Sequence, residues 1–140
     1  MGWYGAQLIM YVRFKDGDQR ETPVWENTCL IQAPDFESAI VLAKERGKLD
    51  EGDGDGDMTW DRRPAEWVFA GVRAVSEVFH ESDDRELGHG DEILFEEFMV
   101  QGLEAVEALV KGRSVSVELT ELGNAPDSEA AENDPSGRIQ

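Results

Sequence analysis

The sequence has little cysteine, little positive charge and no long apolar run, and each shortage narrows the kind of protein it encodes. The single cysteine, Cys29, cannot form an internal disulfide, and its apolar neighbours favour a small core residue in a reducing compartment. No stretch reaches the roughly 18 apolar residues of a membrane span. The N-terminus also lacks the basic and apolar segments of a secretory signal. We therefore expect a cytoplasmic protein.

Positive charge is outweighed by negative charge throughout the chain. The 140 residues contain 13 lysines and arginines against 31 aspartates and glutamates, a formal net charge of -18. Lysine and arginine dominate the affinity for nucleic-acid phosphates and for anionic lipid surfaces. The composition therefore predicts no nucleic-acid partner and no membrane partner. A basic protein partner, a metal ion or solubility alone would each account for the acidity.

Motifs that carry known chemistry are missing too. The sequence contains no nucleophile elbow, no phosphate-binding loop, no dinucleotide-binding glycine pattern and no His-Glu-x-x-His motif. Carboxylates are so abundant that choosing two as an acid–base pair would be arbitrary. We predict no catalytic residues and no cofactor, and a non-enzymatic protein is the favoured interpretation.

The first half of the chain predicts two strands followed by a helix. Residues 3–14 alternate with one wholly apolar face, as a half-buried strand does. A second strand is expected over 22–33, after an Asp-Gly turn. Asp35 is the expected N-cap of a helix that ends at Gly47.

The second half predicts four more strands and one more helix. The strands are expected over 58–60, 65–78, 92–100 and 114–119, with a turn at 61–64, and the helix over 103–110, closed by Gly112. A helix is the alternative for 92–100. The fold class is then α+β, with the order ββαβββαβ and a mostly antiparallel sheet carrying two helices on one face. A single domain over 1–121 precedes a tail over 122–140 that is predicted to be disordered and acidic.

The two predicted helices resemble each other. Residues 36–44 align without a gap to residues 103–111, and a strand that opens on tryptophan precedes each helix. A duplicated ββαβ unit is one explanation, and chance agreement between two amphipathic helices is the other.

The acidic, glycine-rich run over 50–57 invites a calcium interpretation. An EF-hand loop needs glycine at position 6 and a bidentate glutamate at position 12. Counting from Glu51 places Arg62 at position 12, and counting from Asp53 places Met58 at position 6. Both registers fail, so a solvated connection is predicted, with weak cation binding left open. A second group of residues, of the types that bind transition metals, has a spacing that matches no known metal-binding motif. Its members are His80, Asp83, Asp84, His89 and Asp91.

The most distinctive stretch is 64–73, PAEWVFAGVR. Together with Trp3-Tyr4, with PVWEN at 23–27 and with Thr59-Trp60, it resembles the bacterial domain-of-unknown-function family 4288. The resemblance covers roughly residues 3–119. It supports the domain limits and implies no activity, no cofactor and no catalytic residues.

The sheet face turned away from the helices is the predicted site. Aromatic and arginine side chains are enriched at protein interfaces. The side chains expected on this face are Trp3, Tyr11, Arg13, Trp25, Trp67, Phe69 and Arg73, with Asn27 beside them. The alternatives are a second small core under a covering segment, a homodimer or partner interface, and a ligand pocket in which Arg13 or Arg73 meets an anion. A buried Arg73 needs a carboxylate such as Glu26, whereas an exposed one would be available to a ligand.

Two functional hypotheses follow. The first is an acidic interaction domain that binds a basic protein, for example an inhibitor or immunity-type protein that masks a cationic toxin or nuclease face. The second is a small-molecule-binding protein or an unrecognised enzyme that uses the arginine and aromatic face.

Overall fold

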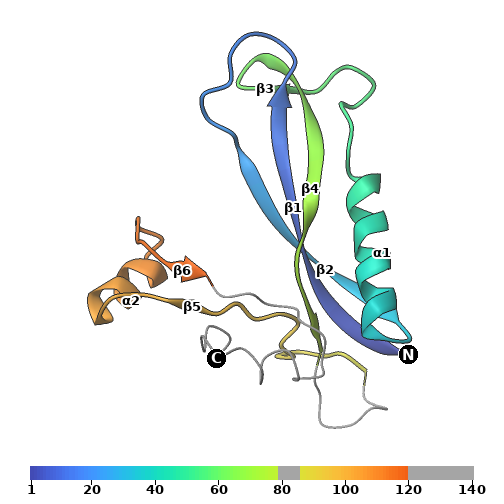
Figure 1. Cartoon of the computed structure of the whole chain (residues 1–140), viewed down its shortest axis with the longest axis vertical. Coiled ribbons are helices and arrows are strands. Elements are labelled where there is room, and N and C mark those ends of the chain that lie inside the picture. Colours follow the sequence, from blue (N-terminus) through green and yellow to red (C-terminus); the bar gives the residue numbers. More distant parts are fainter. Residues whose placement is uncertain (79–85, 120–140) are drawn as a thin grey trace, which may run out of the picture.

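The structure, a computed structural model, describes residues 1–78 and 86–119 (Figure 1). The predicted α+β class and the order ββαβββαβ are confirmed. The elements are β1 (Gly2–Phe14), β2 (Val24–Ala33), α1 (Phe36–Leu49), β3 (Thr59–Trp60), β4 (Arg63–Glu77), β5 (Phe98–Met99), α2 (Leu103–Val110) and β6 (Glu118–Leu119). No helix in these two ranges is long and apolar enough to cross a membrane.

The main sheet is antiparallel, with the strand order β2-β1-β4-β3. β1 lies in the middle and pairs along most of its length with β2 and with β4. A two-residue turn joins β3 to β4, and both of its residues, Asp61 and Arg62, have positive φ. The turn is therefore shorter than the predicted 61–64, because Arg63 and Pro64 already belong to β4.

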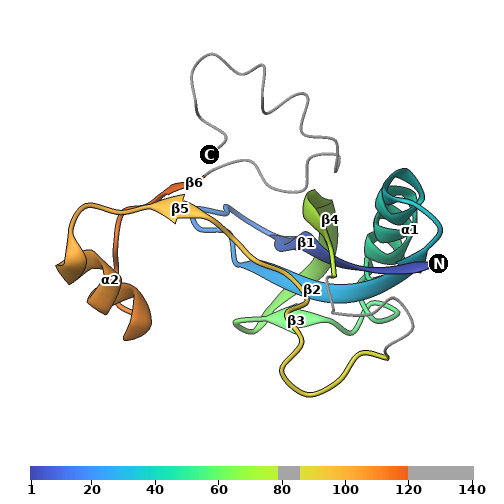
Figure 2. The ribbon, with the colours of Figure 1, turned by 90° about the horizontal axis from the view of Figure 1, so that it is seen from below.

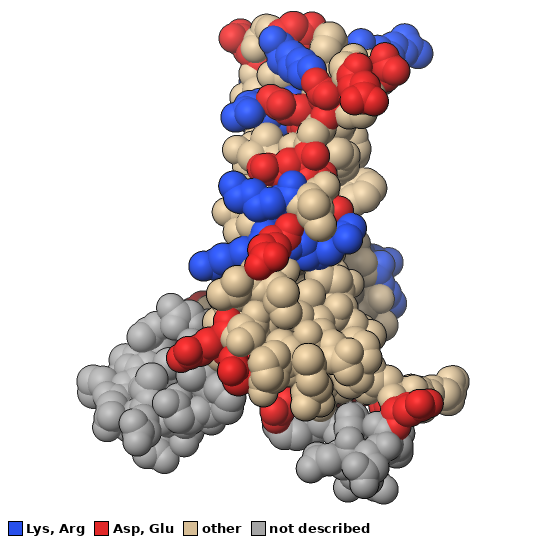
Figure 3. Space-filling view, turned by 90° about the vertical axis from the view of Figure 1, so that its right-hand side faces the viewer, with Lys and Arg blue, Asp and Glu red and all other residues tan. Residues whose placement is uncertain are grey.

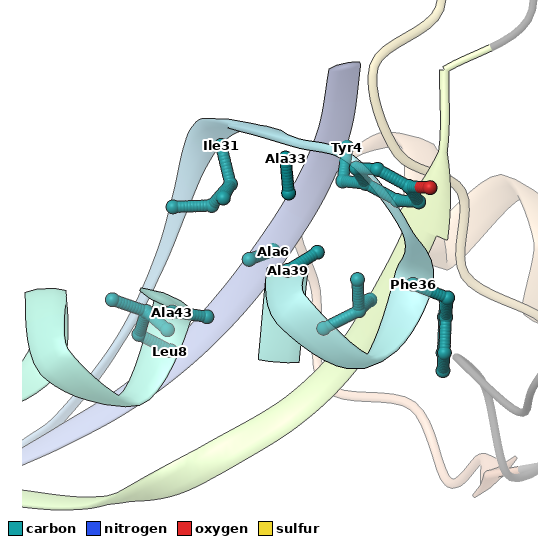
Figure 4. Packing of buried hydrophobic residues seen from close by; sticks show 9 residues of the cluster. Tyr4, Ala6, Leu8, Ile31, Ala33, Phe36, Ala39 and Ala43 are labelled. Atoms are coloured by element: carbon teal, nitrogen blue, oxygen red, sulfur yellow. The ribbon is translucent and has the colours of Figure 1, made fainter. Parts of the chain in front are cut away.

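The core lies between α1 and one face of this sheet. The predicted apolar face of β1 is buried from Tyr4 to Val12. The small residues Ala39 and Ala43 let α1 approach the strands closely (Figure 4). Cys29 packs partly buried against this cluster as a free thiol, and burial raises its pKa.

The predicted start of α1 is confirmed and its predicted end is wrong. The Asp35 side chain accepts a hydrogen bond from the Ser38 backbone N–H at 2.7 Å, as an N-cap does. The helix runs past Gly47 to Leu49. Gly47 is buried inside the helix because the Phe69 ring occupies the space that a side chain would need.

The second half does not repeat the packing of the first, as a duplicated unit would. β4 completes the first sheet, whereas β5 and β6 pair only with each other over two residues each. α2 stands away from the main sheet in both ribbon views (Figures 1 and 2), and it has no buried residue. The placement of two helices on one sheet face is therefore wrong for α2. In the described residues, β4, β5, α2 and β6 follow one another as ββαβ, but they do not pack as β1, β2, α1 and β3 do. The tail over 122–140 lies outside the described residues.

Candidate interaction site at a tryptophan cluster

The predicted site residues divide between the two faces of the sheet. Two register shifts in the β1–β4 pairing leave Ala70 and Arg73 without a partner in β1. Each extra residue reverses the in–out alternation of a strand. The prediction applied one uninterrupted alternation to β4, and this is why it placed Trp67, Phe69 and Arg73 on one face.

The face away from α1 holds four of the predicted residues: Trp3, Tyr11, Arg13 and Arg73. The first three are odd-numbered residues of β1, whose even-numbered residues form the core. Arg13 forms an ion pair with its cross-strand partner Glu66 at 2.9 Å. Part of this face is covered, because the backbone of Ile93 lies directly over Gly5.

Arg73 is engaged by protein carboxylates. Its side chain is 19% exposed and pairs with Glu96 and with Glu26, the latter at 3.4 Å. Glu26 also accepts a hydrogen bond from the buried Gln7 side chain at 2.8 Å. Arg73 is thus partly buried and forms an ion pair with Glu26, the carboxylate that the sequence suggested, although its Nε makes no hydrogen bond. Its guanidinium is thus not offered to an anionic ligand in the way that the pocket alternative requires.

The other predicted residues lie on the α1 face. Trp25 pairs with Met10, Trp67 with Val12, and Phe69 with Met10 from the opposite side. Phe69 packs against the core and Gly47. Trp25 and Trp67 lie beyond the end of the helix, where Asp50 closes α1 as its C-cap.

Three indole rings meet at this position, and we call Trp25, Trp60 and Trp67 the tryptophan cluster. The ring centroids of Trp25 and Trp67 are 4.8 Å apart, those of Trp60 and Trp67 are 5.9 Å apart, and those of Trp25 and Trp60 are 6.3 Å apart. Tilted and edge-to-face contacts of this kind are the favoured geometries of aromatic pairs. Trp25 is nevertheless 50% exposed. The cluster is therefore a cohesive aromatic surface that water still reaches.

Hydrogen bonds and an ion pair hold the acidic loop over 50–57 beside the tryptophan cluster. The backbones of Gly52 and Trp67 exchange two hydrogen bonds, at 2.8 and 3.1 Å. The Glu51 carboxylate accepts a bond from the Phe69 backbone N–H at 2.8 Å. Asp53 pairs with Lys15, and its carboxylate also accepts a bond from the Gly56 backbone. The Lys15 ammonium and then the Gly56 N–H hold the pKa of Asp53 below its ordinary value.

These contacts leave a shallow cavity of about 190 Å³ between the loop and the cluster. Its lining residues are Met10, Trp25, Asn27, Asp50 and Trp67. The Asp50 carboxylate accepts a bond from Arg46 at 2.8 Å, and the two side chains are 35% and 53% exposed. The cavity thus combines two indole rings, a buried thioether, an amide and a carboxylate.

Metal-ligand arrangements do not form in the described ranges. No three histidine, cysteine, aspartate or glutamate side chains there are placed to hold a metal ion. Asp53 directs its carboxylate to Lys15 and Gly56. Of the second predicted set, His80, Asp83 and Asp84 lie outside the described residues.

Sequence reasoning missed Trp60, Met10 and Asp50 as site residues. The short β3–β4 turn could have located Trp60. It pairs Trp60 with Arg63, and Arg63 and Trp67 are four residues apart on β4, so their side chains lie on the same face of that strand. Asp50 carried no comparable signal, since its position depends on where α1 ends.

Comparison with known proteins assigns the family and no activity. Residues 3–94 match the family described as "Domain of unknown function (DUF4288)". No curated protein and no solved structure matches the chain. The match ends at residue 94, short of the predicted 119, so β5, α2 and β6 lie outside it. It includes the main sheet, α1 and the tryptophan cluster, and the chain therefore belongs to the DUF4288 family.

Proposed function

We propose that this protein is a non-enzymatic cytoplasmic interaction domain that binds a basic partner protein through the tryptophan cluster. One observation carries the proposal: three tryptophans, of which Trp25 is half-exposed, form a cluster directly beside a loop with five acidic residues and no basic one. Tryptophan is among the residues that dominate binding energy at protein interfaces. An inhibitor or immunity-type protein that masks a cationic surface is one concrete form of this function.

The charges of the molecule and the indole rings would make different contributions to binding. The net charge of -18 would speed the approach of a basic protein. The α1 side of the molecule nevertheless carries lysine and arginine among the aspartate and glutamate side chains (Figure 3). Because the local charge is mixed, attraction alone would give little specificity. The indole rings would then supply the selective part of the contact.

The rival hypothesis, a ligand site or an enzyme on the arginine and aromatic face, has less support. It needs a guanidinium that is free to meet an anion, and Arg73, which is only 19% exposed, is paired with two carboxylates, Glu26 and Glu96.

Binding of a nona-arginine peptide, followed by isothermal titration calorimetry at low salt, tests the proposal. We expect binding that weakens as salt rises, and Trp25→Ala should reduce the affinity by about tenfold or more, as the loss of an interface hot spot does. Trp3→Ala is the matched control, because Trp3 lies on the opposite sheet face, and it should leave the affinity unchanged. Equal losses in the two variants, or no binding by the natural chain, would overturn the proposal.

A further inference from the structure

We infer that the cavity beside the tryptophan cluster seats one arginine side chain of the basic partner. The inference rests on the proposed function and specifies its chemistry. It places the guanidinium against the Trp25 ring, within reach of Asp50 and Asn27.

The aromatic walls favour a flat cation. Tryptophan is the aromatic side chain that attracts cations most strongly. The centroids of Trp25 and Trp67 are only 4.8 Å apart, so a guest stacks on an exposed ring face instead of entering between the rings. Trp25 lines the cavity and is 50% exposed, so part of its ring surface is open to a guest. A guanidinium is planar and weakly hydrated, and it stacks on aromatic rings more readily than a compact, strongly hydrated ammonium does.

The polar groups of the cavity favour a cation with several donors. Asp50 contributes a carboxylate and Asn27 an amide oxygen. One oxygen of Asp50 accepts a bond from Arg46, and a carboxylate has about four acceptor positions, so capacity remains. A guanidinium carries five N–H donors in a fixed plane and can serve both groups while it stacks. A methylated ammonium would have few or no donors to offer.

The size and surroundings agree with a single inserted side chain. A cavity of about 190 Å³ is smaller than the roughly 300 Å³ at which pockets for drug-sized ligands begin. Its floor is the buried Met10, against which the methylene stem of an arginine can pack.

Peptides of equal charge but different side chains test, on the natural chain, whether the cavity prefers arginine. We expect nona-arginine to bind about fivefold or more tightly than nona-lysine in calorimetry, because stacking and bidentate bonding distinguish the two side chains. A nona-citrulline peptide keeps the planar shape without the charge and should not bind. Equal affinity for arginine and lysine would overturn the seat. The proposed function would survive that result if Trp25→Ala still weakened both peptides.

Two charge-matched variants localise the effect. Asp50→Asn should weaken nona-arginine binding by about fivefold, whereas Asp57→Asn should weaken it by less than about twofold. Asp57 is exposed in the same loop and does not line the cavity. Equal losses would show that general acidity, and not a seat at Asp50, attracts the peptide. Insensitivity to Trp25→Ala would instead refute the proposed function itself.

Discussion

At the scale of single residues, the ring of Phe69 determines why a glycine occupies position 47. A Cβ atom there would lie closer than 3.0 Å to three ring atoms. Alanine normally stabilises a helix interior by about 1 kcal/mol relative to glycine. Overpacking a core costs about 1–3 kcal/mol. We therefore expect Gly47→Ala to lower the free energy of unfolding by about 1 kcal/mol, measured by urea denaturation.

A second variant shows whether the collision is the cause. In a Phe69→Val background the ring is gone, and the same Gly47→Ala change should raise the free energy of unfolding, because only the helix preference remains. An equal destabilisation in both backgrounds would mean that Gly47 serves some other purpose.

The N-cap of α1 predicts a pH dependence. The hydrogen bond from the Ser38 N–H holds the pKa of the Asp35 carboxyl below its ordinary value of 3.8. A carboxyl whose pKa is lower in the folded state stabilises the fold above its unfolded pKa, and this contribution is lost as the pH falls through the folded pKa. Asp35→Ala should therefore lower the melting temperature at pH 7, and the difference from the natural chain should shrink in acid.

Asparagine provides the control for this prediction. It caps helices about as well as aspartate does and does not titrate. Asp35→Asn should therefore melt close to the natural chain at pH 7 and should lack the cap-dependent loss in acid. If Asp35→Ala and the natural chain differed by the same amount at every pH from about 2 to 7, the cap would not depend on ionisation.

At the scale of elements, the sequence predicted local structure well and long-range consequences poorly. The apolar face of β1 and the Asp35 cap follow from neighbouring residues, and both predictions were confirmed. The division of the predicted site between two faces was missed because the bulges at Ala70 and Arg73 depend on how β4 pairs with β1. Gly71, a glycine inside the strand, is the one local sign of such a bulge, and it does not say how far the register shifts.

The end of α1 and the isolation of α2 have the same explanation. Glycine usually closes a helix, but Gly47 is required by a ring on a distant strand. The apolar pattern of α2 suggested a second helix on the sheet, yet Leu103 is 82% exposed. An amphipathic pattern indicates that a helix has an apolar side, and it does not say which surface that side meets.

The segment that crosses the face away from α1 depends on the absence of a side chain at Gly5. A Cβ atom there would collide with the Ile93 carbonyl, which is backbone and cannot rotate away. We expect Gly5→Ala to lift residues 93–96 from the sheet and to break the contact between Arg73 and Glu96. Faster amide exchange across 93–98, measured by mass spectrometry, would report the change.

The matched control for this variant lies in the same strand. At Gly2 an added Cβ would meet the Tyr4 ring at 3.6 Å, which is an ordinary contact. Gly2→Ala should leave exchange across 93–98 as it is in the natural chain. Unchanged exchange in Gly5→Ala would contradict the close packing of Ile93 on β1.

At the scale of the whole molecule, two opposing electrostatic effects decide the response to salt. The described part of the chain contains six ion pairs between partly exposed side chains, and pairs of this kind contribute about 0–1 kcal/mol each. Salt weakens them. Salt also screens the mutual repulsion within a chain of net charge -18, and this repulsion destabilises the compact state.

We expect the repulsion to be the larger effect, because 31 acidic residues outnumber 13 basic ones. Screening becomes effective when the Debye length falls to about 10 Å, near 0.1 M salt. The melting temperature should therefore rise between low salt and about 0.5 M sodium chloride, measured by circular dichroism, and potassium chloride should act equally if screening is the cause. Binding of nona-arginine should weaken over the same range. A melting temperature that rises with salt while the affinity for nona-arginine falls is the result expected of an acidic domain that binds a basic partner. A melting temperature that fell with salt would show that the ion pairs, and not the net charge, dominate the electrostatics of the fold.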